Sequence, residues 1–136
     1  MLSETIEKIY LGTAERIKQD DSLACYAKKV EKEDCKIDFT LSAKKLDFII
    51  RGVTPIPGAF AYLNGKMLKI NKAIPVNEEG TPGRVIDLSD KGDGYITVAC
   101  GEGALKITTL IPEGKGKMSA GAFVRGRKIA LGDILE

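Results

Sequence analysis

The first hydrophobic pattern along the chain has the spacing of an α-helix. Side chains that can pack recur every three or four residues between charged ones, at Ile6, Ile9, Tyr10, Thr13 and Ile17. This spacing places them on one stripe and predicts a helix over residues 3–18, which Ser3 can cap. The stripe must bury against a partner. The sequence leaves open whether that partner lies in this chain.

The next two segments differ in periodicity. Residues 22–41 show little of it, so we expect an extended linker that lies along the following domain. From residue 42 the helical spacing returns, with Leu46, Ile49 and Ile50 on one face. Ser42 is the expected N-cap. The sequence therefore predicts a short helix, over residues 42–51, immediately before the rest of the domain.

Beyond this helix the pattern is that of short strands separated by turns. Asn64-Gly65 joins two apolar runs and predicts a hairpin, because both residues of a type I′ turn need positive φ. The expected strands span residues 59–63, 66–75, 84–88, 95–100, 104–111 and 128–131, with a short helix at 118–123. Short strands with glycine-rich turns, preceded by a helix, predict a mainly β fold in the form of a small barrel.

Composition limits the class of protein and its chemistry. The chain of 136 residues is 43% hydrophobic and fits one soluble domain with a terminal appendage. No apolar run approaches the roughly 18 residues of a membrane span. Its three cysteines form no C-x-x-C pair, which favours reduced thiols in the cytoplasm. The absence of histidine excludes Ser-His-Asp and Cys-His nucleophiles within this chain.

The net charge of +2 conceals blocks of opposite sign. Residues 48–77 carry 4 Lys or Arg and no Asp or Glu, and residues 103–128 carry 6 Lys or Arg and 1 Asp or Glu. Between these two basic blocks, residues 78–102 carry 2 Lys or Arg and 6 Asp or Glu. Such blocks are typical of a polarised surface that binds a polyanion. A solvated surface with ordinary lysines explains the counts equally well.

Three lysines of the first basic block follow the predicted hairpin turn. Lys66 and Lys72 share one face of a regular strand, and Lys69 lies on the other unless a bulge intervenes, because side chains alternate. A single row of lysines along this strand is therefore not guaranteed. Aromatic residues are few, so contacts with phosphates are favoured over base stacking.

Lys115 and Lys117 belong to a glycine-rich loop in the second basic block. This loop lacks the spacing and the Ser or Thr of a P-loop, and Gly101-Glu102-Gly103 lacks the third glycine of the dinucleotide fingerprint. We interpret both as connections between strands. Lys115 and Lys117 are candidates for further phosphate contacts, and we expect the nearby run Arg125, Arg127 and Lys128 to be exposed.

The carboxylates near the second segment do not form a recognisable metal site. Glu33 and Asp34 alternate with lysines and are interpreted as part of a solvated linker. Asp38 differs because it lies between Ile37 and Phe39, as a partly buried group would. We expect it to pair with a cation such as Arg51.

Several short motifs follow one another in a fixed order. They are Tyr26-Ala27-x-Lys29, Lys32-Glu33-Asp34, Ile37-Asp38-Phe39, Ser42-Ala43, Ile50-Arg51, Pro55-x-Pro57-Gly58-Ala59, Lys69-Ile70-x-Lys72-Ala73, Pro82-Gly83-x-Val85, Ala99-Cys100-Gly101-Glu102-Gly103-x-Leu105-x-Ile107, and Gly114-Lys115 to Met118-x-Ala120-x-x-Phe123. Together they resemble the C-terminal domain of methionyl-tRNA formyltransferases, over about residues 22–135. The family usually has Trp where this chain has Phe39, and often where it has Ile56; both are apolar replacements.

The resemblance implies an OB-like, Greek-key barrel over residues 42–136 and a linker over 22–41. Residues 1–21 would form a helix that joins a missing or separate catalytic domain. It implies a module that binds initiator tRNA through the acceptor arm in translation initiation. The family's catalytic Asn, His and Asp have no match here, so we expect neither catalysis nor a cofactor in this chain. The linker lysines Lys28, Lys29 and Lys32 are then expected on the inner side of the acceptor arm.

Two other interpretations stay open. The domain could serve as a structural or interaction module that orients a catalytic domain, or that forms a homodimer through helix 3–18. A complete enzyme is the third interpretation, but the chain lacks a general base and a cofactor motif. Related formyltransferase-like hydrolases and transformylases carry the same type of domain, so the resemblance identifies the domain and leaves the parent activity open.

Overall fold

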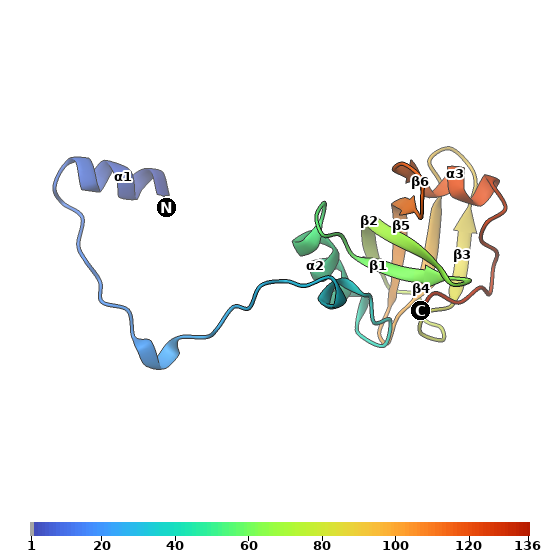
Figure 1. Ribbon diagram of the computed structural model, residues 1–136, viewed down its shortest axis with the longest axis horizontal. Helices are drawn as coiled ribbons and strands as arrows, with labels where there is room; N and C mark the ends of the chain where they lie inside the picture. Colours follow the sequence, from blue (N-terminus) through green and yellow to red (C-terminus); the bar gives the residue numbers. More distant parts are fainter. Residues whose placement is uncertain (1) are drawn as a thin grey trace.

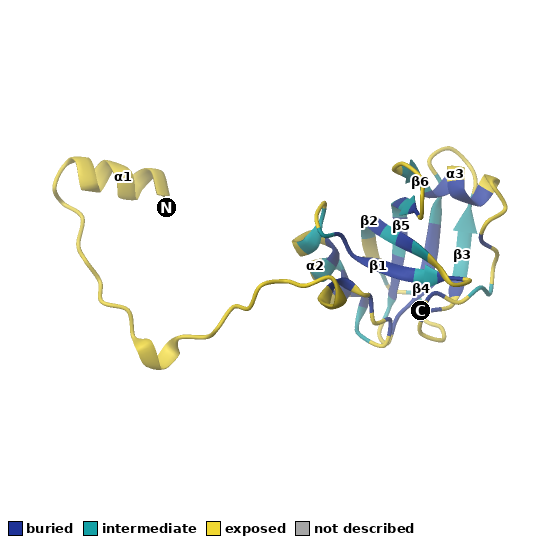
Figure 2. Cartoon of the chain, in the orientation of Figure 1, coloured by how far each residue is buried: buried dark blue, intermediate teal, exposed yellow. Residues whose placement is uncertain are grey.

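A computed structural model describes residues 2–136 and contains a mainly β domain preceded by an extended segment (Figure 1). Every residue from 2 to 34 is exposed, and the first buried residue is Cys35 (Figure 2). Followed from the sheet toward the N-terminus, this segment extends away from the domain, and the first helix lies at its far end (Figure 1). The predicted linker therefore does not lie along the domain over most of its length.

The first helix, α1 (Leu2–Tyr10), ends earlier than the predicted one. Gly12 has a φ of +69°, and the Thr13 amide donates to the carbonyl oxygen of Lys8 at 2.9 Å. This is the hydrogen bond of a Schellman motif, which glycine closes easily because it has no Cβ. The last two members of the predicted stripe are thus outside the helix. None of the side chains of α1 is buried.

The end of the predicted linker enters the core. Two short 3-10 turns, η1 (Asp21–Leu23) and η2 (Glu33–Cys35), interrupt the extended chain. Cys35, Ile37 and Phe39 are buried and alternate with exposed residues, as they would on a strand. The amide of Ile37 donates to the Phe60 carbonyl oxygen at 2.8 Å, which attaches this segment to the sheet.

The predicted helix before the sheet is confirmed as α2 (Ala43–Val53). The Ser42 hydroxyl oxygen caps it by accepting a hydrogen bond from the Lys45 amide at 3.4 Å. Leu46 and Ile50 are almost fully buried, and the helix packs on two central strands of the sheet. The apolar face expected from the sequence is the face that joins the core.

Six strands form one antiparallel sheet in the order β1-β2-β5-β4-β3, with β6 paired to β5 (Figure 1). The strands are β1 (Phe60–Leu63), β2 (Lys66–Val76), β3 (Val85–Ser89), β4 (Tyr95–Ala99), β5 (Ala104–Pro112) and β6 (Met118–Ser119). β6 leads into α3 (Ala120–Arg125). The region predicted as one short helix at 118–123 is thus a two-residue strand, β6, followed by the start of α3.

The predicted hairpin is confirmed. β1 and β2 pair with Leu63 opposite Lys66, and the turn residues Asn64 and Gly65 have φ values of +50° and +73°. These are the positive φ values that a type I′ turn requires. The turn fixes which side chains of β2 face inward, so Leu68 and Ile70 are buried.

The predicted small barrel is not confirmed, because the strands form an open sheet whose outer strands are β1 and β3. The predicted last strand at 128–131 is wrong, because these residues form no strand. Instead, the end of the chain lies between the two outer strands. The Leu135 amide donates to Gly83, next to β3, at 2.8 Å, and the Glu136 amide donates to Tyr62 of β1 at 2.9 Å. The OB-like architecture stays a prediction.

Candidate nucleic-acid interface

The lysines of the predicted hairpin lie in different surroundings. Register shifts occur on both sides of Lys72, so a bulge separates it from the regular part of β2. Lys69 is half-buried, and its ammonium donates to the Pro57 carbonyl oxygen at 3.1 Å. Lys66 and Lys72 are exposed and line two different pockets. The three lysines of β2 therefore contribute to separate places on the surface.

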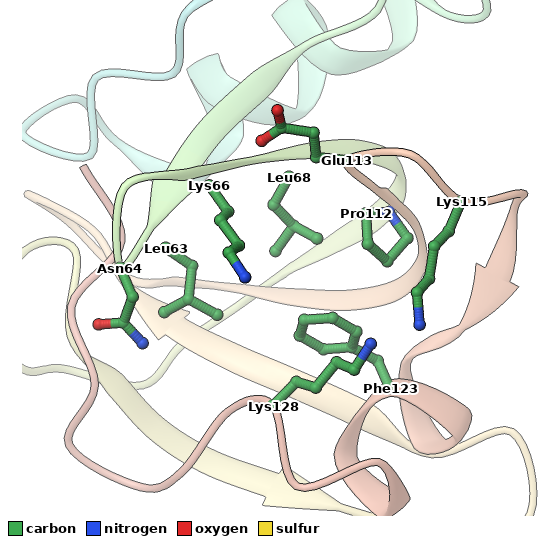
Figure 3. A pocket seen from close by; sticks show the side chains of 9 residues that line it. All are labelled: Leu63, Asn64, Lys66, Leu68, Pro112, Glu113, Lys115, Phe123 and Lys128. Atoms are coloured by element: carbon green, nitrogen blue, oxygen red, sulfur yellow. The ribbon is translucent and has the colours of Figure 1, made fainter.

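Lys66 joins lysines from two distant segments. It lies beside Lys115, from the loop after β5, and Lys128, from the segment after α3, around a cavity of about 330 Å³ (Figure 3). We call this cavity the hairpin pocket. Its remaining lining residues are Leu63, Asn64, Leu68, Pro112, Glu113 and Phe123. Three ammonium groups thus surround an inner surface that is mostly apolar.

The charges in the hairpin pocket repel one another. The neighbouring ammonium of Lys115, with a smaller contribution from Lys66, holds the pKa of Lys128 below its ordinary value. The carboxylate of Glu113 accepts a hydrogen bond from the Met67 amide at 3.0 Å and points away from the ammonium groups (Figure 3). Sequence reasoning predicted Lys128 to be exposed but did not place it in a site, because its convergence with Lys66 depends on the tertiary fold.

A second pocket lies beside the same loop. Lys72 and Lys117 line it together with the hydroxyl-bearing side chains Thr108, Thr109 and Ser119, around about 470 Å³. Asp93 also lines this pocket, so its charge is less one-sided. Because Lys115 and Lys117 belong to one loop, residues 113–117 border both pockets. Four of the five candidate lysines in the domain therefore gather around this loop, and Lys69 does not.

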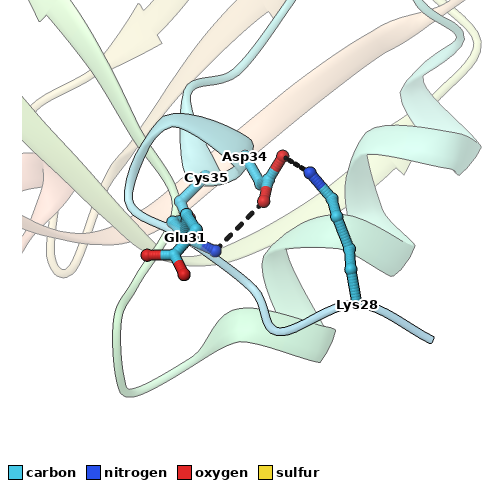
Figure 4. Close-up of polar contacts among 4 residues, drawn as sticks. All are labelled: Lys28, Glu31, Asp34 and Cys35. Carbon is cyan, nitrogen blue, oxygen red and sulfur yellow. Dashed lines mark hydrogen bonds and ion pairs between the residues drawn. The ribbon is translucent and has the colours of Figure 1, made fainter.

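The linker lysines are exposed, and one of them is paired. The Lys28 ammonium lies 2.7 Å from Oδ1 of Asp34, whose Oδ2 accepts from the Glu31 amide at 3.0 Å (Figure 4). Hydrogen bonding with the opposite charge raises the pKa of Lys28 and lowers that of Asp34. An ion pair this exposed to solvent contributes little to the stability of the protein. Lys29 and Lys32 are exposed and form no ion pair within residues 2–136.

Asp38 does not pair with Arg51. Its carboxylate accepts hydrogen bonds from the hydroxyl and the amide of Thr40, at 2.6 and 3.0 Å, and the hydroxyl bond is the main cause of its lowered pKa. Arg51 pairs with Asp47, one helical turn earlier, at 3.0 Å. Asp47 and Arg51 are neighbours on the surface of α2 because they are four residues apart, so the helix itself brings the two side chains together.

The described part of the chain holds no candidate metal centre. Within residues 2–136, no group of three His, Cys, Asp or Glu side chains could hold a metal ion. The thiol of Cys100 is buried, and burial raises its pKa to about 11, so it is neutral at physiological pH. No helix in this range is both long and apolar enough to cross a membrane.

The sequence matches a known family over most of its length. Residues 29–128 match the family described as "Formyl transferase, C-terminal domain". The chain belongs to this family. This formyl transferase C-terminal domain is 45% identical to the methionyl-tRNA formyltransferase of Geotalea uraniireducens (strain Rf4), over 98% of this chain and 42% of that protein. It is 39% identical to that of Lachnospira eligens, over 99% of this chain and 44% of that protein.

The resemblance predicted from the ordered motifs is thus confirmed, and the chain spans less than half the length of these relatives. Among solved structures, a variant of HypX from Aquifex aeolicus is similar with a TM-score of 0.67 at 20% identity, covering 96% of this chain and 23% of HypX. The structure of HypX in complex with tetrahydrofolic acid is similar with a TM-score of 0.64 at 23% identity, covering 93% of this chain and 22% of HypX. At these identities the likeness shows the fold of this formyl transferase C-terminal domain and nothing more.

Proposed function

We propose that this chain is the tRNA-binding C-terminal module of a methionyl-tRNA formyltransferase. The parent enzyme would transfer a formyl group from formyltetrahydrofolate to initiator Met-tRNA in the cytoplasm. Family membership supports this assignment, and so does the length of the relatives, which leaves room for a separate catalytic domain. The module itself would hold the acceptor arm, without a cofactor of its own.

The observation that carries the binding role is the gathering of lysines around the loop at 113–117. Lys66, Lys115 and Lys128 line the hairpin pocket, and Lys72 and Lys117 line the second pocket. None of these five forms an ion pair within residues 2–136. Lysines without a carboxylate partner are available to phosphates, which position a nucleic acid without reading its sequence.

The linker lysines would extend this surface toward the catalytic domain. Lys29 and Lys32 are free to contact the inner side of the acceptor arm, whereas Lys28 must first leave Asp34. Because that ion pair is exposed, the exchange costs little. Lys69 would add a weaker contact, since its ammonium already donates to Pro57.

An electrophoretic mobility shift assay with initiator tRNA at several salt concentrations tests the proposal. The test variant carries Lys29→Gln, Lys32→Gln, Lys72→Gln and Lys117→Gln, and the matched control carries Lys44→Gln on α2. Each lost phosphate contact should flatten the plot of log K against log salt by about 0.9 for a duplex. The control should bind as the wild-type chain does. Absence of binding at low salt, or an unchanged slope in the test variant, would show that these lysines do not hold tRNA.

The exposed face of α1 supports a second candidate, a role in protein interaction. Ile6 and Ile9 are 58% and 63% exposed, and Tyr10 is 89% exposed. If this face forms a homodimer, light scattering after size exclusion should show a dimer that Ile6→Asp abolishes. Lys8→Gln, on the opposite face, should leave it intact. A monomer at every concentration would rule out dimerisation through α1.

A further inference from the structure

The hairpin pocket holds three positive charges that the protein does not neutralise. Within residues 2–136, neither Lys66, Lys115 nor Lys128 forms an ion pair. The one carboxylate that lines the pocket, Glu113, is engaged by the amide of Met67 and turned outward (Figure 3). Long, flexible lysine side chains would ordinarily spread into solvent to reduce their repulsion. Their convergence indicates a site that is completed by an anion.

We propose that the hairpin pocket binds a terminal phosphate group, that is, a phosphate monoester dianion or the free anion. Such a group presents three non-bridging oxygens, one for each ammonium, and carries a charge of about −2 near neutral pH. A phosphodiester inside a nucleic acid presents two such oxygens and a single charge. The number of donors and the total charge of the pocket therefore match a terminal phosphate better than an internal one.

The shape of the pocket favours the same ligand. Its walls come from three separate parts of the chain, namely the hairpin, the loop at 113–117 and the segment around α3 (Figure 3). The inner surface between them is formed by Leu63, Leu68, Pro112 and Phe123. An apolar wall offers no competing hydrogen bonds and lowers the local dielectric, which strengthens each ammonium–phosphate contact. An end group can enter such a pocket from one side, whereas a continuous strand would have to leave it again.

The phosphate has two sources with the same chemistry. One is a small free anion, such as phosphate or pyrophosphate. The other is the 5′-terminal phosphate of an RNA, and this source alone rests on the proposed tRNA-binding function. The acceptor arm of a tRNA carries that 5′ end, so the pocket would then bind the end of the arm and fix its position on the domain.

Titration of the full chain with inorganic phosphate and with pyrophosphate tests the pocket directly. Isothermal calorimetry should give saturable binding that weakens at least about tenfold in Lys128→Gln and in Lys115→Gln, the cost of one charge-assisted contact. Lys44→Gln is the matched control and should bind as the wild-type chain does. Circular dichroism verifies that each variant is folded. Absence of saturable binding, or binding that both pocket variants retain, would overturn the proposal.

A second titration distinguishes the two sources. A short RNA hairpin is compared with and without its 5′-phosphate, in the wild-type chain and in Lys128→Gln. If the ligand is an RNA end, the phosphorylated RNA binds more tightly, and Lys128→Gln removes that preference. Equal binding of both RNAs, with phosphate binding retained, identifies the free anion as the ligand. The mobility shift assay with tRNA substitutes only lysines outside the hairpin pocket. The two experiments therefore distinguish a failure of the proposed tRNA-binding function from a failure of the proposed phosphate site.

Discussion

Gly101 lies where the segment before α2 crosses the connection between β4 and β5. Its amide donates to the carbonyl oxygens of Phe39 and Leu41, at 2.8 and 3.0 Å. A Cβ at position 101 would overlap the carbonyl oxygen of Thr40 and would lie 2.7 Å from its carbonyl carbon. Ordinary contacts of a Cβ begin at 3.4 Å. The nearest atoms belong to the backbone and not to a flexible side-chain end, so Gly101→Ala forces the two segments apart by on the order of 1 Å.

The cost of this substitution has two parts. Overpacking of a closely packed site costs about 1–3 kcal/mol. Separation of the segments also weakens the shared hydrogen bond of the Gly101 amide, which contributes about 1 kcal/mol. We expect Gly101→Ala to lower the free energy of unfolding by about 2–4 kcal/mol. For a domain of this size, the midpoint of thermal unfolding should fall by on the order of 10 °C.

Thermal and urea unfolding followed by circular dichroism measure the effect. Gly116→Ala is the matched control, because no atom lies within 4 Å of a Cβ at that position. It should change the free energy of unfolding by no more than about 0.5 kcal/mol. If Gly101→Ala unfolds at the same temperature as this control, then the segment at 39–41 does not lie against Gly101 as described.

Two further predictions concern a helix cap and the thiols. Ser42→Ala removes the cap of α2 and should lower the free energy of unfolding by about 0.5–1 kcal/mol. Ser3, the predicted cap of the first helix, lies within α1, none of whose side chains is buried, so Ser3→Ala should have no effect. Equal urea midpoints for the two variants would contradict the cap. A thiol reagent at pH 8 should label Cys25, which is exposed, but not Cys35 or Cys100, which are buried. Since the pKa of Cys100 is about 11, only about one molecule in a thousand carries its thiolate at that pH. Its labelling in the folded protein should rise only as the pH approaches that pKa, and labelling of all three at pH 8 without denaturant would refute this account.

The elements that the sequence predicts well are those with strong local signals. The hairpin follows from Asn64-Gly65, because few residue pairs accept positive φ at both positions. α2 follows from Ser42 and from the apolar spacing of Leu46 and Ile50, which are one helical turn apart. The early end of α1 also has a local cause in Gly12, but the apolar spacing beyond it favoured a longer helix. A periodic pattern alone does not form a helix where a glycine completes the C-terminal cap.

The candidate site is less predictable because its members are far apart in the sequence. Lys66 and Lys72 share a face in a regular strand, yet the bulge in β2 separates their surroundings. Lys115 and Lys117 are two residues apart and line different pockets. Lys128 reaches Lys66 only because the segment after α3 folds back beside the hairpin (Figure 3). Blocks of basic charge therefore predict a binding surface without predicting which lysines meet.

By itself, the sequence determined the mainly β class, the hairpin, α2 and the family, because each depends on local backbone preference or on motifs in order. It also placed the positive charge in two blocks. The tertiary structure decided how the outer strands are covered, since the chain end pairs with both Gly83 and Tyr62. It likewise decided that three lysines surround one pocket. Both depend on contacts between distant segments, which are set by the packing of the core and leave no periodic signal along the chain.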